Sequence, residues 1–174
     1  IGIVVVAAVL LLLGGAALWV DLPLARYCLA RNTPSELREL FERGESFGHA
    51  HGVVLIALSV GFIGAARWRT AFRLGGVALL AGIAADVVKV FFFRMRPSRM
   101  GSEIQTVWDS FLGFVPWLGS NDSALPFWET SYHSLPSAHT ATAVALACGL
   151  ASLFPRARGW FFFLALLTAA NRVD

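Results

Sequence analysis

The sequence predicts an all-α fold, a polytopic helical membrane protein that forms one domain over residues 1–174. Hydrophobic residues make up 57% of the chain and charged residues only 14%. The apolar residues come in long blocks, whereas a soluble domain would show periodic amphipathic segments, and blocks of about 18 or more apolar residues are typical of bilayer spans. The sequence contains no internal repeat at a solenoid period and no low-complexity tract, so one helical membrane domain accounts for the pattern.

Five apolar blocks are the candidate spans, and they cover residues 3–20, 53–66, 74–93, 140–154 and 160–170. The first block is long for the core of a signal peptide and no small-residue cleavage site follows it, so we interpret it as an anchor helix, with a signal peptide as the alternative. A span needs about 20 residues, so we expect the second and fourth spans to extend into their flanks. The chain starts at Ile1 and ends at Asp174, directly after an apolar block, and we expect a sixth span beyond it.

A short amphipathic helix is predicted between the first two spans. Thr33 followed by Pro34 is typical of a helix start, and Gly44 is typical of a helix end. The apolar residues between them share one face, and they are Leu37, Leu40 and Phe41. Such a helix lies on a membrane surface, either as a plain interfacial anchor or with a role in lipid access.

The arginines of the short links predict how the chain crosses the membrane. They lie between the second and third spans and between the fourth and fifth: Arg67, Arg69, Arg73, Arg156 and Arg158. The positive-inside rule places both links in the cytoplasm, so residues 21–48 and 94–137 lie on the outer side. We therefore expect an integral protein of a bacterial inner membrane, with these outer segments facing the periplasm. The net charge of +3 lies in loops and helix ends, so no nucleic-acid partner is predicted.

The end of the third span carries two cations. Lys89 and Arg96 are seven residues apart, so a continuous helix would place them on one stripe, about 10 Å apart along its axis. Pro97 disfavours helix at Arg96 and is expected to end the span there. Asp86 lies one turn before Lys89, and because ionisable residues inside a span usually pair, we expect an ion pair between them. A snorkelling lysine and arginine at a helix end is the alternative interpretation.

The fourth span opens with the sequence Pro136-Ser137-Ala138-His139. Ser137 suits an N-cap, and the backbone N–H groups that follow it then lack partners within the helix. A helix start of this kind is an anion site, and His139 in the first turn could donate a proton to a bound anion. A capped helix with an interfacial histidine is the other interpretation. The two motifs lie at span ends that the loop arginines place on the same outer face.

These motifs resemble those of the type 2 phosphatidic acid phosphatase (PAP2) family, which are K-x6-R-P, P-S-G-H and S-R-x5-H-x3-D. The first motif matches fully, at Lys89, Arg96 and Pro97. The second matches at residues 136–139, with Ala138 in place of glycine. In the third, Asn171 replaces serine and Arg172 matches, and the chain ends two residues later. The likeness covers the chain from about residue 74 onward and indicates the membrane-bound, lipid phosphatase branch.

The resemblance implies a metal-independent hydrolase that removes phosphate from a membrane lipid through a phosphohistidine intermediate. The nucleophilic histidine and its partner aspartate would lie beyond Asp174, and His139 would be the general acid. The phosphate-binding residues would be Lys89, Arg96, Ser137, Ala138 and Arg172, and the supporting residues would be Asp86, Pro97 and Pro136. No cofactor is implied, and the partners are the bilayer and the lipid phosphate.

The residues themselves agree with metal independence, because no group of acids and histidines has metal-ligand spacing along the chain. The nearest candidate is His49-x-His51, which we interpret as two interfacial histidines. Cys28 and Cys148 give neither a metal spacing nor a disulfide framework. The segment 101–133 is rich in aromatic residues, and we interpret it as a lid lying on the membrane surface.

Two other functions fit part of the pattern. A non-catalytic polytopic membrane protein, such as a transporter subunit, would place polar residues near the midplane of broken spans, whereas here they cluster at one face. A vanadate-binding haloperoxidase would use the same phosphate cradle, but those relatives of the family are soluble. The predicted function is therefore a lipid phosphate phosphatase. Phosphatidate, phosphatidylglycerol phosphate, a polyprenyl diphosphate and a lipid A phosphate all suit such a site.

Overall fold

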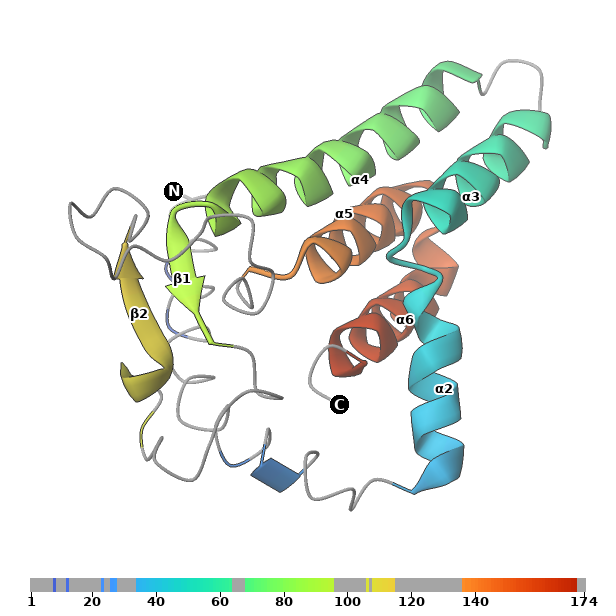
Figure 1. The fold of residues 1–174 in the computed structure, drawn as a ribbon. Coiled ribbons are helices and arrows are strands. Elements are labelled where there is room, and N and C mark those ends of the chain that lie inside the picture. Colours follow the sequence, from blue (N-terminus) through green and yellow to red (C-terminus); the bar gives the residue numbers. More distant parts are fainter. Residues whose placement is uncertain are drawn as a thin grey trace.

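The computed structural model describes residues 34–63, 68–95, 108–114 and 136–171, together with residues 8, 12, 23, 26, 27 and 106. These ranges are mostly helical, as predicted, and Figure 1 shows five α-helices beside a two-stranded antiparallel sheet. The helices are α2 (Ser35–Glu45), α3 (Ala50–Phe62), α4 (Trp68–Lys89), α5 (Ala138–Leu153) and α6 (Arg158–Ala170). The strands are β1 (Phe92–Arg94) and β2 (Phe111–Phe114), and the 3-10 turns are η3 (Trp108–Ser110) and η6 (Pro155–Ala157).

Four of the five apolar blocks correspond to helices, namely α3, α4, α5 and α6. The predicted amphipathic helix corresponds to α2, which runs one residue past Gly44. The predicted anchor helix at residues 3–20 lies outside the described residues, apart from two isolated positions, as does most of the aromatic segment 101–133.

The third apolar block is only partly helical, which corrects the all-α prediction. Helix α4 ends at Lys89, and Phe92–Arg94 then pair with Phe111–Phe114 as an antiparallel sheet. The run of valine and phenylalanine after Lys89 favours extended backbone. Phe93 is fully buried, and the buried Arg94 donates from Nε to Ser110 Oγ over 3.0 Å. The projection of Lys89 and Arg96 onto one helical stripe is therefore wrong, and Arg94 holds the hairpin.

The helices pack as an antiparallel group through small residues. Gly82 of α4 lies against Thr142 near the start of α5, whereas Gly149 further along α5 lies against Leu74 nearer the start of α4. Helix α3 runs antiparallel to α4 in the same way, since Gly61 lies against Trp68. The core between the helices includes Ala78, Ala143, Leu146, Ala147 and Val53, all with no exposed surface. The starts of α3 and α5 and the ends of α4 and α6 consequently share one end of the molecule (Figure 1).

The outer face of α4 is apolar and exposed. Its exposed large side chains include Phe72, Val77, Leu80, Ile83 and Val87. Among the helices within the described ranges, α4 alone is both long and apolar enough to cross a membrane, with 22 residues and a mean hydropathy of 1.7 in its most apolar window. Helices α3 and α5 are apolar but shorter. The described residues thus contain one helix of spanning length where the sequence predicted several.

The corner between α2 and α3 docks closely onto α5 and α6. Phe47 anchors this corner in the core. A Cβ atom at Gly44 would lie 2.6 Å from Leu167 Cβ of α6. A Cβ atom at Gly48 would lie 2.5 Å from the carbonyl oxygen of His139. Glycine is therefore required at both positions, at Gly44 by the close approach of the Leu167 side chain and at Gly48 by the His139 carbonyl, and His49 lies beside the start of α5.

We predict that Gly48→Ala destabilises the protein while Gly76→Ala does not. The added methyl group at Gly48 would contact the His139 carbonyl and lie 2.6 Å from Thr168 Cγ2, and overpacking of this kind costs about 1–3 kcal/mol. At Gly76 in α4 an added Cβ meets nothing within 4 Å, and alanine is favoured over glycine in a helix by about 1 kcal/mol. Thermal unfolding of the three purified proteins measures the difference, and equal midpoints for Gly48→Ala and the unsubstituted protein would contradict the close approach.

Candidate functional site

The start of α5 has the capped geometry that the sequence predicts. Ser137 is the N-cap, with extended backbone, and its hydroxyl oxygen accepts from the Thr140 N–H over 3.3 Å. The first backbone hydrogen bond of the helix runs from the Ala141 N–H to the Ser137 carbonyl. The N–H groups of Ala138 and His139 precede this bond and point out of the helix end. Together with the helix dipole, they make the start of α5 favourable for an anion.

Lys89 and Asp86 form the predicted ion pair at the end of α4. Lys89 Nζ lies 3.0 Å from Asp86 Oδ1. The lysine side chain is 20% exposed and the aspartate side chain 63% exposed. The carboxylate thus holds the ammonium group of Lys89 at the same end of the molecule as the start of α5.

An open cavity of about 380 Å³ lies between the starts of α3 and α5 and the last turns of α4. Its lining includes Gly48, His49, Gly82, Asp86, Ala138 and His139. Gly82 keeps α4 close to α5 on one side of the cavity, and the corner at Gly48 closes the other side. The cavity therefore opens beside the capped helix start and the predicted acid, His139.

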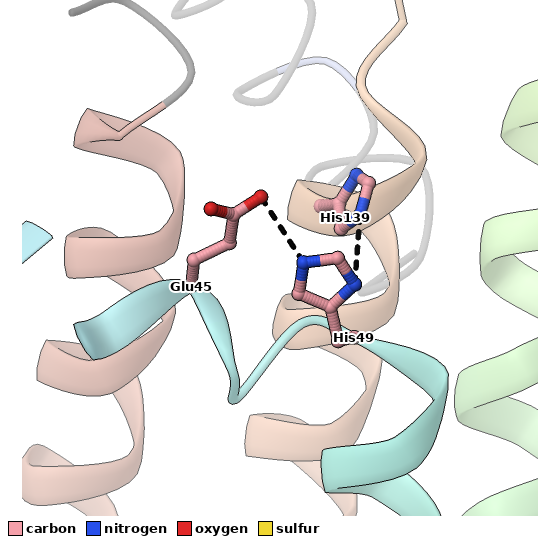
Figure 2. A group of neighbouring side chains, drawn as sticks. All are labelled: Glu45, His49 and His139. Atoms are coloured by element: carbon pink, nitrogen blue, oxygen red, sulfur yellow. Dashed lines mark hydrogen bonds and ion pairs between the residues drawn. The ribbon is translucent and has the colours of Figure 1, made fainter. Parts of the chain in front are cut away.

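His139 belongs to a chain of polar contacts that reaches three other helices. Figure 2 shows His139 Nε2 facing His49 Nδ1 at 3.2 Å, and His49 Nε2 facing Glu45 Oε1 at 3.1 Å. The second oxygen of Glu45, Oε2, accepts from the Asn171 side-chain amide over 2.7 Å. The chain thus links the last residue of α2, the N-cap of α3, the first turn of α5 and the C-cap of α6.

Comparison with protein families identifies the family to which this chain belongs. Residues 70–173 match the model of the PAP2 superfamily. The chain belongs to the PAP2 superfamily. The family resemblance inferred from the sequence is therefore confirmed, and because members of this superfamily are phosphatases, the chain is assigned to the hydrolases of phosphoric esters. No curated protein and no solved structure shows a significant match to it.

The protonation of His139 in this PAP2 member is set by its surroundings at the helix end, just before the predicted span 140–154. Burial lowers the pKa of the His139 imidazole below its ordinary value, and His49 and Lys89 lower it further, whereas Asp86 acts in the opposite direction. Lys89 and Asp86 are therefore within electrostatic reach of His139. A bound anion favours the imidazolium form, so an anion in the cavity would raise the pKa of His139.

Glu45, His49 and His139 form a cluster that the sequence analysis missed. One ligand-type atom from each lies within 4.8 Å of the others, so the absence of metal-ligand spacing along the chain did not exclude such a cluster in space. Helix packing, not spacing along the chain, brings them together, because 90 residues separate His49 from His139. The local signal of this cluster in the sequence is the i,i+4 spacing of Glu45 and His49, each of which follows a glycine. Metal independence remains a prediction.

The structure brings together five of the predicted site residues at one end of the helices, and these are Asp86, Lys89, Ser137, Ala138 and His139. Pro136 directly precedes the cap. Arg96, Pro97 and Arg172 lie outside the described residues. His51 stacks on the His49 ring at a centroid distance of 5.1 Å. The two histidines of the His49-x-His51 pair thus differ in their contacts, since His49 contacts His139 whereas His51 only stacks on the His49 ring.

We predict that Ser137→Ala lowers stability while Ser137→Asp preserves it. Alanine removes the oxygen that accepts from Thr140 N–H, and loss of an N-cap typically costs about 1 kcal/mol. Aspartate provides a capping oxygen and a negative charge at the positive end of the helix. Chemical or thermal unfolding checks the order, and Ser137→Ala with unchanged stability would mean that the hydroxyl does not cap α5.

Proposed function

We propose that this PAP2 member is a membrane-embedded phosphatase that hydrolyses the phosphomonoester or diphosphate of a lipid. One observation carries the proposal: the start of α5 and His139 line one cavity together with Asp86, which pairs with Lys89. Lys89 supplies a cation, the start of α5 supplies oriented N–H donors, and His139 supplies a group that can transfer a proton. These are the parts that phosphoryl transfer requires, because catalysis of that reaction is mainly positioning and charge stabilisation.

The phosphate oxygens are held by cations and by backbone N–H groups. Lys89, Arg96 and Arg172 would neutralise the charge, with arginine suited to paired contacts with two oxygens. Ser137 and the N–H of Ala138 would complete the cradle. Asp86 orients Lys89 through their 3.0 Å contact. Pro136 and Pro97 would hold the chain on either side of the binding segments, and no metal or cofactor takes part.

His139 acts as the general acid in this mechanism. A histidine of the third family motif, expected beyond Asp174, attacks phosphorus, and the bond from phosphorus to the lipid oxygen breaks. His139 gives its proton to the departing alkoxide. Water then attacks the phosphohistidine, the P–N bond breaks, and the proton lost by water returns to His139. The bound phosphate would raise the lowered pKa of His139, so the acid would become charged when substrate is present.

The membrane setting is supported by the outer faces of the helices. Large apolar side chains are exposed on α3 and α6 as well as on α4, for example Leu55, Phe62, Trp160 and Leu166. Soluble monomers rarely expose contiguous apolar patches larger than a few hundred Å², whereas lipid tails cover them without cost. The cavity lies at one end of the helices, at the level where a lipid headgroup would enter.

The orientation proposed is that of a bacterial inner-membrane protein whose site faces the periplasm. The antiparallel packing puts the start of α4 and the link between α5 and α6 at the end opposite His139. That end carries the exposed arginines Arg69, Arg73, Arg156 and Arg158. Such an excess of arginine in short links favours the cytoplasmic side.

Phosphate release from a panel of lipid phosphates tests the proposed function. We expect the gene extended past Asp174 to encode an active enzyme, with His139→Ala slower by about 10²–10⁴-fold and Lys89→Ala slower by about 10²–10³-fold. Arg158→Ala is the matched control, because this exposed arginine lies at the opposite end and its loss should leave the rate unchanged. Release by a folded His139→Ala protein at the normal rate would refute its role, and no release from any lipid would favour the non-catalytic alternative.

Chelation tests metal independence. We expect EDTA to leave phosphate release by the complete enzyme unchanged, because fixed cations and N–H groups stabilise the transferring phosphate. The measurement is the initial rate before and after EDTA treatment and dialysis. A loss of activity that a divalent ion restores would contradict this expectation.

A further inference from the structure

His49 links a carboxylate to the predicted acid through both nitrogens of its ring (Figure 2). A carboxylate can only accept, so the 3.1 Å approach of Glu45 Oε1 to His49 Nε2 favours the proton of His49 on Nε2. A neutral imidazole then has an acceptor at its other nitrogen, so His49 Nδ1 accepts from His139 Nε2–H. This order leaves Nδ1 of His139 as the nitrogen that exchanges a proton with a ligand.

We propose that Glu45 and His49 are positioning residues that hold His139 in the Nε2–H tautomer, with the Glu45 carboxylate offsetting the positive charge that His139 carries as an acid. The inference rests on the proposed function, in which His139 protonates the leaving group. A carboxylate bonded to an imidazole acts in this way in other acid–base sites, where it fixes tautomer and orientation and stabilises the imidazolium without itself taking the proton. Glu45 and His49 lie before residue 70, outside the segment that matches the PAP2 superfamily.

The hydrogen-bond chain lets His139 change charge without reorganisation. In the acidic form both nitrogens of His139 carry a proton, and Nε2–H donates to His49 while Nδ1–H faces the substrate. Transfer of the Nδ1 proton to the leaving alkoxide makes His139 neutral and keeps the Nε2–H bond to His49. Attack of water on the phosphohistidine returns one proton to Nδ1. The Glu45 carboxylate lies beside His49 and offsets the charge on the two rings.

The fold holds this chain rigidly on the Glu45 side. The Asn171 amide fixes Glu45 Oε2 over 2.7 Å and thereby directs Oε1 to His49. The residue before each of them is also held, since Thr168 Oγ1 donates to the Gly44 carbonyl over 2.9 Å and Gly48 lies against the His139 carbonyl. The side chains of His49 and Glu45 are 37% and 22% exposed, so water screens their interaction only in part.

A divalent cation is the competing occupant of this cluster, and the ring geometry favours the hydrogen-bond chain. One imidazole cannot bind a single ion through both of its nitrogens, and His49 turns a different nitrogen to each neighbour. An ion held by all three residues would use one nitrogen of His49 and leave out the contact that its other nitrogen makes. Without an ion, both ring nitrogens of His49 already have a polar neighbour, one in His139 and one in Glu45.

The test compares two substrates that differ in their need for an acid. The enzyme completed past Asp174 is assayed on a dialkylglycerol phosphate, whose alkoxide must be protonated, and on p-nitrophenyl phosphate, whose phenolate is a stable anion. The variants are Glu45→Gln, which removes the charge, and His49→Asn, which keeps an acceptor near the Nδ1 position but breaks the link to Glu45. His51→Gln is the matched control, because His51 stacks on His49 without joining the chain.

We expect kcat/KM for the alkyl phosphate to fall by about 10- to 100-fold in Glu45→Gln and His49→Asn, a part of the roughly 10²–10⁴-fold that a general acid contributes. The value for p-nitrophenyl phosphate should change little in both variants. His51→Gln should match the unsubstituted enzyme on both substrates. Equal losses on the two substrates would mean a purely structural role, and unchanged rates on both would mean no role, so either result overturns the proposal.

Two further measurements keep the inference separate from the proposed function. NMR of the ¹⁵N-histidine-labelled protein reports which ring nitrogen is protonated, and we expect Nε2–H at neutral His139; protonation at Nδ1 would overturn the proposal even in a protein without activity. Metal analysis of the purified protein should find no stoichiometric ion. A bound divalent ion that His49→Asn loses would assign the cluster to the metal instead. An inactive enzyme with the expected tautomer would refute the phosphatase and leave the hydrogen-bond chain standing.

Discussion

The close approach of the α2–α3 corner to the start of α5 and the end of α6 is the contact on which the site depends. Glycine at positions 44 and 48 permits it, because any side chain there would meet Leu167 or the His139 carbonyl. The hydrogen bond from Thr168 to the Gly44 carbonyl secures the approach from α6. Glu45 and His49 are carried on this corner, so the packing that closes the helix group also sets the distance between His49 and His139.

Electrostatics at this end of the molecule couple an anion to the protonation of His139. Asp86 offsets much of the charge of Lys89, while the start of α5 adds the equivalent of about half a positive charge. Burial and the neighbouring His49 and Lys89 disfavour the imidazolium. In the proposed mechanism, a phosphate beside Lys89 reverses this balance. The acid then becomes charged at the moment when the leaving group needs its proton.

The outer surface is the observation that supports the proposed membrane setting. Covering a large aliphatic or aromatic side chain is worth about 1.5–3 kcal/mol compared with leaving it in water, and the outer faces of α3, α4 and α6 expose many of them. Helices satisfy their own backbone hydrogen bonds, so lipid can cover these faces without an unpaired polar group. The candidate site residues that the structure describes lie at the helix ends, which in the proposed setting is where a lipid headgroup and water meet.

The sequence by itself determined the helical character of the described segments, the cap at Ser137, the pair of Asp86 with Lys89 and the PAP2 family, because these depend on residues within a few positions of one another. It extended the third helix too far, since strand pairing of residues 92–94 with 111–114 competes with helix and is invisible to local periodicity. Only the tertiary structure decided that Glu45 and His49 reach His139. That contact joins residues 90 positions apart, and it arises from helix packing and glycine contacts, which leave no periodic trace along the chain.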